Sequence, residues 1–186
     1  MRVLGISGSL RRDSHNTELL RAAATLLPSG VEFELYDGLR DIPPYDEDQD
    51  KAQVAAVTDL KERIAAADAV LIATPEYNHS VPGVLKNAMD WVSRPLADTP
   101  LKGKPVAVIG ASTGMFGAVW AQAELRKVLG AIGAKVIDRE LPVPMADEIV
   151  RDREKLESSG THSLIVGILA ELLEAADTHA EVGAAA

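Results

Sequence analysis

The chain contains no cysteine among its 186 residues. This absence excludes disulfide bonds, catalytic thiolates and cysteine-based metal sites. Because thiol redox chemistry is excluded as well, any electron transfer by this chain requires a bound cofactor.

Basic residues are also scarce, since 19 lysines and arginines stand against 28 aspartates and glutamates, for a net charge of −9. Both nucleic acid and an anionic membrane surface would repel such a chain, which argues against either as a partner. No apolar run approaches the roughly 18 residues of a membrane span, and no signal-peptide pattern follows Met1. We therefore expect a cytoplasmic protein.

The composition is that of a globular protein, with 47% hydrophobic and 25% charged residues. We expect a single domain over residues 1–178, followed by a frayed tail at 179–186. The acidic segment 41–50, which contains Pro43 and Pro44, is expected to be an exposed loop.

Short apolar runs alternate with helical patterns along the chain, which is typical of an α/β fold with a parallel sheet covered on both faces. The predicted strands are residues 3–7, 31–36, 69–74, 105–111 and 134–140. The predicted helices are residues 17–27, 51–67, 83–93, 118–131 and 147–177, the last interrupted near 158–160.

The loop after the first strand, residues 8–18, is rich in hydrogen-bond donors and precedes a helix. Backbone N–H groups at a helix N-terminus favour an anion, and Arg11 can add charge-assisted bonds to phosphate oxygens. The alternative is plain helix capping by Ser14 or Asn16. The spacing matches neither a P-loop nor a dinucleotide-binding glycine motif.

The loop after the third strand places Tyr77 between Glu76 and Asn78, ahead of a proline and glycine that open the next helix. A flat ring flanked by hydrogen-bonding side chains suits a planar heterocycle. A proline turn with an ordinary surface tyrosine is the alternative. His79 is expected to be a polar loop residue rather than a metal ligand, and no metal site is predicted.

The loop after the fourth strand contains Gly110, Gly114 and Gly117, which would let backbone N–H groups approach a ligand. Its string GASTG also satisfies the nucleophile-elbow pattern of α/β-hydrolases, with Ser112 as the nucleophile. The possible triad partners are Asp138, Asp147 or Asp152 with His162 or His179. These histidines fall in a predicted helix and in the predicted tail, and an HGGG oxyanion motif is missing, so the hydrolase remains the alternative.

Taken together, the three loops resemble the NADPH-dependent FMN reductase family, which includes chromate, quinone and azo-dye reductases. The resemblance spans residues 2 to about 140 and is carried by GSLRRDSHNTELL, TPEYNHSVPGVLKNAMDW and GASTGMFGAVWAQAELRKVL. It implies a flavodoxin-like three-layer sandwich with a five-stranded parallel sheet in the order 2-1-3-4-5.

The resemblance also implies FMN as the cofactor. It assigns the FMN phosphate and ribityl chain to Ser9, Arg11, Ser14, Asn16 and Thr17. It places along the isoalloxazine ring Pro75, Glu76, Tyr77 and Asn78, and at the other ring edge Ser112, Thr113, Gly114 and Gly117.

Two positions depart from the family pattern, because Ala118 stands where the family often has a second glycine and Trp120 where it often has arginine. Family members are typically homodimers or homotetramers. The apolar Met89, Trp91 and Val92 fit either a subunit interface or the core of one subunit.

The implied activity is hydride transfer from NADPH or NADH to bound FMN and on to a quinone, azo, nitro, chromate or free-flavin acceptor. The chain would mainly position the reactants, so no catalytic residue is named. A flavodoxin-type electron carrier on the same fold is the non-enzymatic alternative.

Overall fold

A parallel sheet forms the centre of the computed structural model, which describes residues 1–49 and 54–184. Its strands lie in the order β2, β1, β3, β4, β5, and β6 also pairs with β4. The strands are β1 (Arg2–Ser7), β2 (Glu32–Tyr36), β3 (Ala69–Thr74), β4 (Pro105–Ala111), β5 (Lys135–Val136) and β6 (Pro142–Val143). This order confirms the predicted flavodoxin-like α/β fold.

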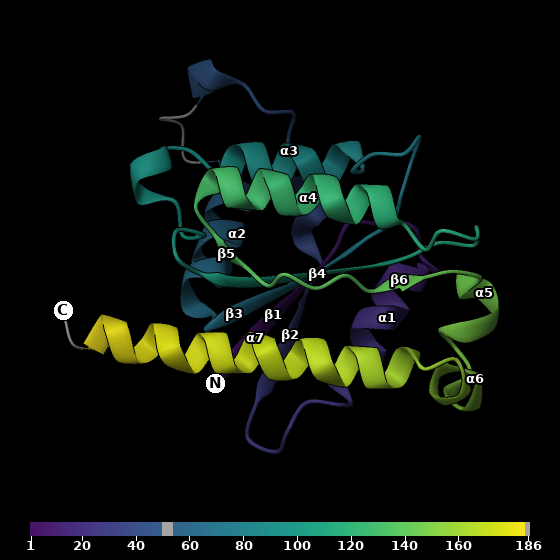
Figure 1. Ribbon diagram of the computed structural model, residues 1–186. Helices are drawn as coiled ribbons and strands as arrows, with labels where there is room; N and C mark the ends of the chain where they lie inside the picture. Colours follow the sequence, from purple (N-terminus) through teal and green to yellow (C-terminus); the bar gives the residue numbers. More distant parts are fainter. Residues whose placement is uncertain (50–53, 185–186) are drawn as a thin grey trace.

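Helices cover both faces of the sheet. They are α1 (His15–Ala24), α2 (Ala55–Ala66), α3 (Gly83–Val92), α4 (Val119–Ile132), α5 (Ala146–Ile149), α6 (Arg153–Ser158) and α7 (Thr161–Ala184). In Figure 1, α3 and α4 lie on one side of the strands, whereas α1 and the long α7 lie on the other. Two separate hydrophobic clusters, one on each face, give the molecule its three layers.

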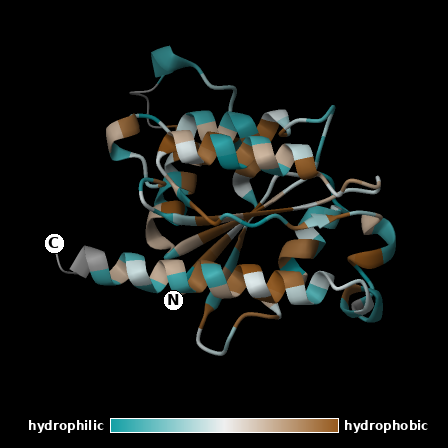
Figure 2. Ribbon diagram, viewed as in Figure 1, coloured by the Kyte–Doolittle hydropathy of each residue, from teal (hydrophilic) through white to brown (hydrophobic). Residues whose placement is uncertain are grey.

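Strand β3 shows how the sequence produces these layers. Successive side chains of a strand point to opposite faces. Ala69, Leu71 and Ala73 accordingly pack in the cluster beneath α1 and α7, and Val70 and Ile72 in the cluster beneath α2, α3 and α4. Figure 2 shows the hydrophobic colouring concentrated along the strands between the helical layers. Such a run is apolar throughout because both of its faces are buried.

The predicted fifth strand, residues 134–140, is wrong in its extent. The chain pairs with β4 over two short stretches, Lys135–Val136 and Pro142–Val143. Ile137 and Leu141 still hydrogen-bond to β4, so the interruption is confined to residues 138–140. In that gap, Arg126 on α4 forms ion pairs with Asp138 at 3.4 Å and with Glu140 at 3.2 Å. These carboxylates reach solvent and their cation, which explains why a continuous strand does not form.

The acidic loop is more firmly anchored than predicted. Ile42 is buried, and the Pro43 carbonyl accepts hydrogen bonds from Asn87 Nδ2 and Trp91 Nε1, both at 2.8 Å. Asp41, Pro44 and residues 46–49 of the loop are exposed. Residues 50–53 lie outside the described residues, and α2 begins at Ala55.

Three residues considered for a subunit interface, Met89, Trp91 and Val92, are at most 2% exposed and belong to the core. The interface explanation of these residues is therefore wrong.

The C-terminal helical region breaks near the predicted place, at Gly160, whose φ is +75°. Beyond it, α7 continues to Ala184, so a frayed end from residue 179 is wrong for the described residues. Alanine and glutamate favour helix here, and His179 lies against Gly103. Among the described residues, no helix is both long and apolar enough to cross a membrane.

Candidate functional site

The loops after β1, β3 and β4 surround a cavity of about 250 Å³ at the carboxyl edge of the sheet. The strand order reverses next to β1, which is where ligands bind in doubly wound sheets. The predicted residues that line the cavity are Ser9, Arg11, Ser14, Asn16, Pro75, Glu76, Tyr77, Ser112 and Thr113. His15 and Ala111 line it as well, and the sequence did not predict them.

The first loop becomes rigid where α1 begins. Ser14 is buried, and its Oγ accepts a hydrogen bond from the Thr17 N–H at 3.2 Å. The Glu18 N–H donates to the Ser14 carbonyl at 3.0 Å. The first N–H groups of a helix lack acceptors within it, and the first two residues of α1, His15 and Asn16, line the cavity. Capping and anion binding are therefore compatible at Ser14.

Asn16 joins the first loop to the third. Its Nδ2 donates to the Ala111 carbonyl and its Oδ1 accepts from the Ala111 N–H, both at 2.9 Å. Asn16 is only 3% exposed. Both ends of the amide are thus engaged by the protein, so this side chain fixes the spacing of the two loops.

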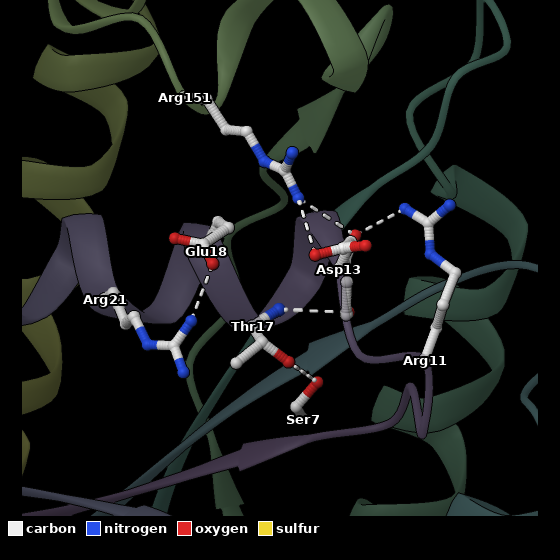
Figure 3. A network of polar contacts seen from close by, with 8 residues as sticks. Ser7, Arg11, Asp13, Thr17, Glu18, Arg21 and Arg151 are labelled. Carbon is white, nitrogen blue, oxygen red and sulfur yellow. Dashed lines mark hydrogen bonds and ion pairs between the residues drawn. The ribbon is translucent and has the colours of Figure 1, made fainter.

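Thr17 does not line the cavity. Its Oγ1 donates to Ser7 Oγ at 2.8 Å, and the residue borders a hollow on the other side of the loop. Figure 3 shows this pair beneath the start of α1. Because Thr17 follows Asn16 in the helix, its side chain points about 100° away around the helix axis.

The second loop is a tight turn that leaves Tyr77 54% exposed. The Tyr77 N–H donates to the Ser80 carbonyl at 3.2 Å, and the Ser80 N–H donates back at 3.1 Å. Asn78 and His79 occupy the tip with φ of +54° and +60°. Asn78 therefore lies at the end of the turn and is not among the residues that line the cavity.

Glu76 connects this loop to α4. Its Oε2 accepts hydrogen bonds from the N–H groups of Trp120 at 3.0 Å and Ala121 at 3.1 Å. A carboxylate at a helix N-terminus is stabilised by the positive end of the helix dipole. His79 Nδ1 also lies 3.4 Å from Glu76 Oε1. Glu76 thus borders the cavity and holds its wall in place.

The glycines of the third loop lie outside the cavity lining, and one of them has a packing role. Gly114 and Gly117 do not line the cavity. Gly117 has φ of +57°, and a Cβ there would lie 2.5 Å from the Val143 nitrogen. Gly117 therefore permits close packing of the loop against β6. Ala118 follows in the left-handed region with φ of +63°, which explains why the family often has glycine at this position.

The geometry around Ser112 does not form a hydrolase triad. Its Oγ lies 3.5 Å from the Gly114 carbonyl, and no histidine among the described residues hydrogen-bonds to it. Helix α4 begins only at Val119, whereas a nucleophile elbow turns sharply from strand into helix. Four of the triad candidates lie elsewhere: Asp138 beside Arg126, Asp152 at the start of α6, His179 against Gly103, and His162 in a separate hollow beneath α1 and α6.

An aromatic cluster stands on the rim next to Glu76. The rings of His79 and Trp120 are 4.6 Å apart, and those of Phe116 and Trp120 are 4.9 Å apart. Phe116 is 60% exposed and Trp120 40%. The sequence indicated Trp120 only as a departure from the family pattern, because the contact between the second and third loops depends on the fold.

Positive charge gathers at the opposite end of the cavity. Arg11 donates to the Asp13 carbonyl at 2.6 Å, and Arg151, from the segment between α5 and α6, donates to the same oxygen at 3.3 Å. Figure 3 shows the two guanidinium groups approaching Asp13 from different sides. Burial first, and then the charges of Arg11 and Arg151, lower the pKa of His15. Its Nδ1 is buried and has no hydrogen-bond partner among the described residues.

The fold and this cavity together define a flavodoxin-like α/β protein with a donor-rich loop at the sheet edge. Residues 1–148 match the family model described as NADPH-dependent FMN reductase. An NAD(P)H-dependent FMN reductase of Pseudomonas aeruginosa is 52% identical over 130 residues, which cover 69% of each chain. A quinone reductase of Escherichia coli is 43% identical over 141 residues, 75% of this chain and 74% of the relative.

A solved structure is similar over almost the whole chain. FerB, a flavoenzyme NAD(P)H:(acceptor) oxidoreductase from Paracoccus denitrificans, aligns with a TM-score of 0.83 and 35% identity over 96% of this chain and 98% of that one. The chain belongs to the NADPH-dependent FMN reductase family.

Proposed function

We propose that the chain is an FMN-dependent NAD(P)H oxidoreductase that reduces quinones, and that azo, nitro, chromate and free-flavin acceptors are further substrates. The observation that carries the proposal is the composition of the cavity, which joins an anion-binding helix start at one end to an exposed tyrosine and an aromatic rim at the other. The names of the relatives from Pseudomonas aeruginosa and Escherichia coli support the same activity.

The residues present fit FMN at both of its ends. At the phosphate end, Ser9 and Arg11 border the cavity beside the first N–H groups of α1, a donor set that suits a phosphate. Pro75, Tyr77 and Thr113 also line the cavity and offer apolar and hydrogen-bonding surface for a planar ring.

Bound FMN would supply the redox chemistry by accepting hydride from NAD(P)H and releasing electrons to an acceptor. The residues of the chain would bind FMN and orient it for the reaction. Arg11 would neutralise part of the phosphate charge, Ser9 would hydrogen-bond to it, and Tyr77 and Thr113 would border the ring. The Asn16 amide keeps the first and third loops at a fixed distance. The aromatic rim gives a planar acceptor a stacking surface next to the ring.

The Arg11→Ala variant tests the phosphate end. We expect it to weaken FMN binding by roughly 1.5–3 kcal/mol, the usual contribution of a hydrogen bond to a charged group, or about ten- to a hundredfold in dissociation constant. Flavin fluorescence titration measures the affinity. Riboflavin, which lacks the phosphate, is the matched ligand control, and its affinity should be unchanged. Equal FMN affinities of variant and wild type would remove Arg11 from the phosphate site.

A further inference from the structure

A second hollow, of about 180 Å³, lies on the other side of the first loop, at the carboxyl ends of β1 and β2. The two hollows share Ser9 and Arg11. Four arginines line the second one, and it is called the arginine hollow here: Arg11, Arg12, Arg21 and Arg40. Asp37 is the only carboxylate among its lining residues. This local excess of positive charge stands out in a chain whose net charge is −9.

Most of this positive charge is not neutralised by carboxylates. Arg21 forms an ion pair with Glu18 at 2.6 Å. Arg40 donates to the Leu10 carbonyl at 3.0 Å, and Arg11 likewise donates to a backbone carbonyl. Arg12 has no ion-pair partner within the part of the chain that the structure describes. Guanidinium groups held only by neutral oxygens retain their attraction for an anion.

Neutral side chains, including the hydroxyls of Ser7 and Thr17, line the arginine hollow between its arginines. Figure 3 shows Arg11 and Arg21 on either side of the Ser7–Thr17 hydroxyl pair. Tyr36 lines the hollow too, and burial, followed by the charge of Asp59, raises the pKa of Tyr36 to about 12. The phenol therefore stays protonated and adds no negative charge that would oppose an anion.

The donors of the two hollows differ in kind. The cavity has the backbone N–H groups of α1, which are fixed and suit a phosphate that remains bound. The arginine hollow has exposed, flexible guanidinium groups, which suit a phosphate on a ligand that binds and leaves in each turnover. NADPH differs from NADH only by such a group, a phosphate monoester on its adenosine ribose.

We propose that the arginine hollow binds the 2′-phosphate of NADPH and makes the enzyme prefer NADPH to NADH, an inference that rests on the proposed function. Arg12 and Arg40 are the residues that distinguish the two nucleotides, because they line the arginine hollow and do not border the FMN cavity.

Calorimetric titration of the FMN-loaded protein tests the proposal, with adenosine 2′,5′-bisphosphate and adenosine 5′-monophosphate as probes. The bisphosphate should bind at least about tenfold more tightly than the monophosphate. Arg12→Gln and Arg40→Gln should each weaken bisphosphate binding about three- to tenfold, since these guanidinium groups are exposed to solvent. Both variants should raise KM for NADPH and leave KM for NADH unchanged. Arg139→Gln, which removes the same charge beside Glu171 and away from the hollow, should change none of these values.

Three results would overturn the proposal: equal affinities for the two probes, bisphosphate binding that survives both substitutions, or a matching loss of FMN affinity in Arg12→Gln, which would assign the hollow to the FMN phosphate. Arg12 tests this without disturbing the fold, whereas Arg40 also holds Leu10. Failure of the proposed function has a different signature: the FMN-loaded wild type would oxidise no NAD(P)H, whereas the two probes report on the arginine hollow without turnover.

Discussion

Replacing Gly117 by alanine is expected to lower the free energy of unfolding by about 3–4 kcal/mol, since the new methyl group meets backbone and cannot be accommodated by a side-chain rotation. The added Cβ would lie 2.5 Å from the Val143 nitrogen and 2.6 Å from the Pro142 carbonyl carbon. The φ of +57° adds strain of its own for any residue with a Cβ. Urea unfolding followed by circular dichroism measures the change.

Gly114→Ala is the matched control in the same loop. A Cβ at Gly114 would meet only Ser112 Oγ, at 3.8 Å, and Gly114 has no positive φ. Its substitution should therefore change stability by less than about 0.5 kcal/mol. If the two variants have the same free energy of unfolding, Gly117 does not pack against β6 as described. The predicted contact with the isoalloxazine ring would then be the better explanation for glycine at this position.

The Asn16→Ala variant is expected to lose about 2–5 kcal/mol, because it leaves the N–H and C=O of Ala111 buried without partners and each costs about 1–3 kcal/mol. The two hydrogen bonds lost are both 2.9 Å long and join loops that are 95 residues apart in sequence. We also expect weaker FMN binding, because the first and third loops would no longer be held at a fixed spacing. Thermal unfolding and FMN titration measure the two effects.

Thr17→Val provides the control for Asn16. It keeps the side-chain volume, follows Asn16 in the same helical turn and removes one hydrogen bond between partly exposed hydroxyls. We expect a loss of about 1 kcal/mol and little change in FMN affinity. An Asn16→Ala protein as stable as Thr17→Val would contradict the bridging role of the Asn16 amide.

The sequence predicted the three loops because each follows an apolar strand directly and carries glycine, serine, threonine or asparagine in a short stretch. Parallel strands bring their carboxyl ends to one edge, so chain order alone places the loops together. The strand order, by contrast, was implied by the resemblance to the FMN reductase family, and the sheet has that order. For Ser9, Arg11 and Tyr77, the predicted loop position also proved to be the cavity wall.

Side-chain direction within those loops could not be predicted. Thr17 turns to Ser7, and Asn78 sits at the tip of a turn, because helix rotation and left-handed backbone decide where each side chain points. Contacts between residues far apart in the sequence could not be predicted either. Glu76 caps α4, and Arg151 reaches the first loop from 138 residues further along the chain. Such contacts depend on how the layers pack, and the sequence around each partner contains no pattern that predicts them.

The most direct test of the central claim is to measure NAD(P)H oxidation by the FMN-loaded protein with a benzoquinone acceptor, beside hydrolysis of an activated ester, in wild type and Ser112→Ala. We predict FMN-dependent oxidation with ping-pong kinetics, since nicotinamide and quinone use the same open face in turn. Ser112→Ala should reduce this rate about tenfold at most, because it removes one hydrogen bond, whose net contribution is about 0.5–1.5 kcal/mol. Bound FMN without NAD(P)H oxidation would indicate an electron carrier, and ester hydrolysis that depends on Ser112 without FMN-dependent oxidation would indicate a hydrolase; either result would contradict the account.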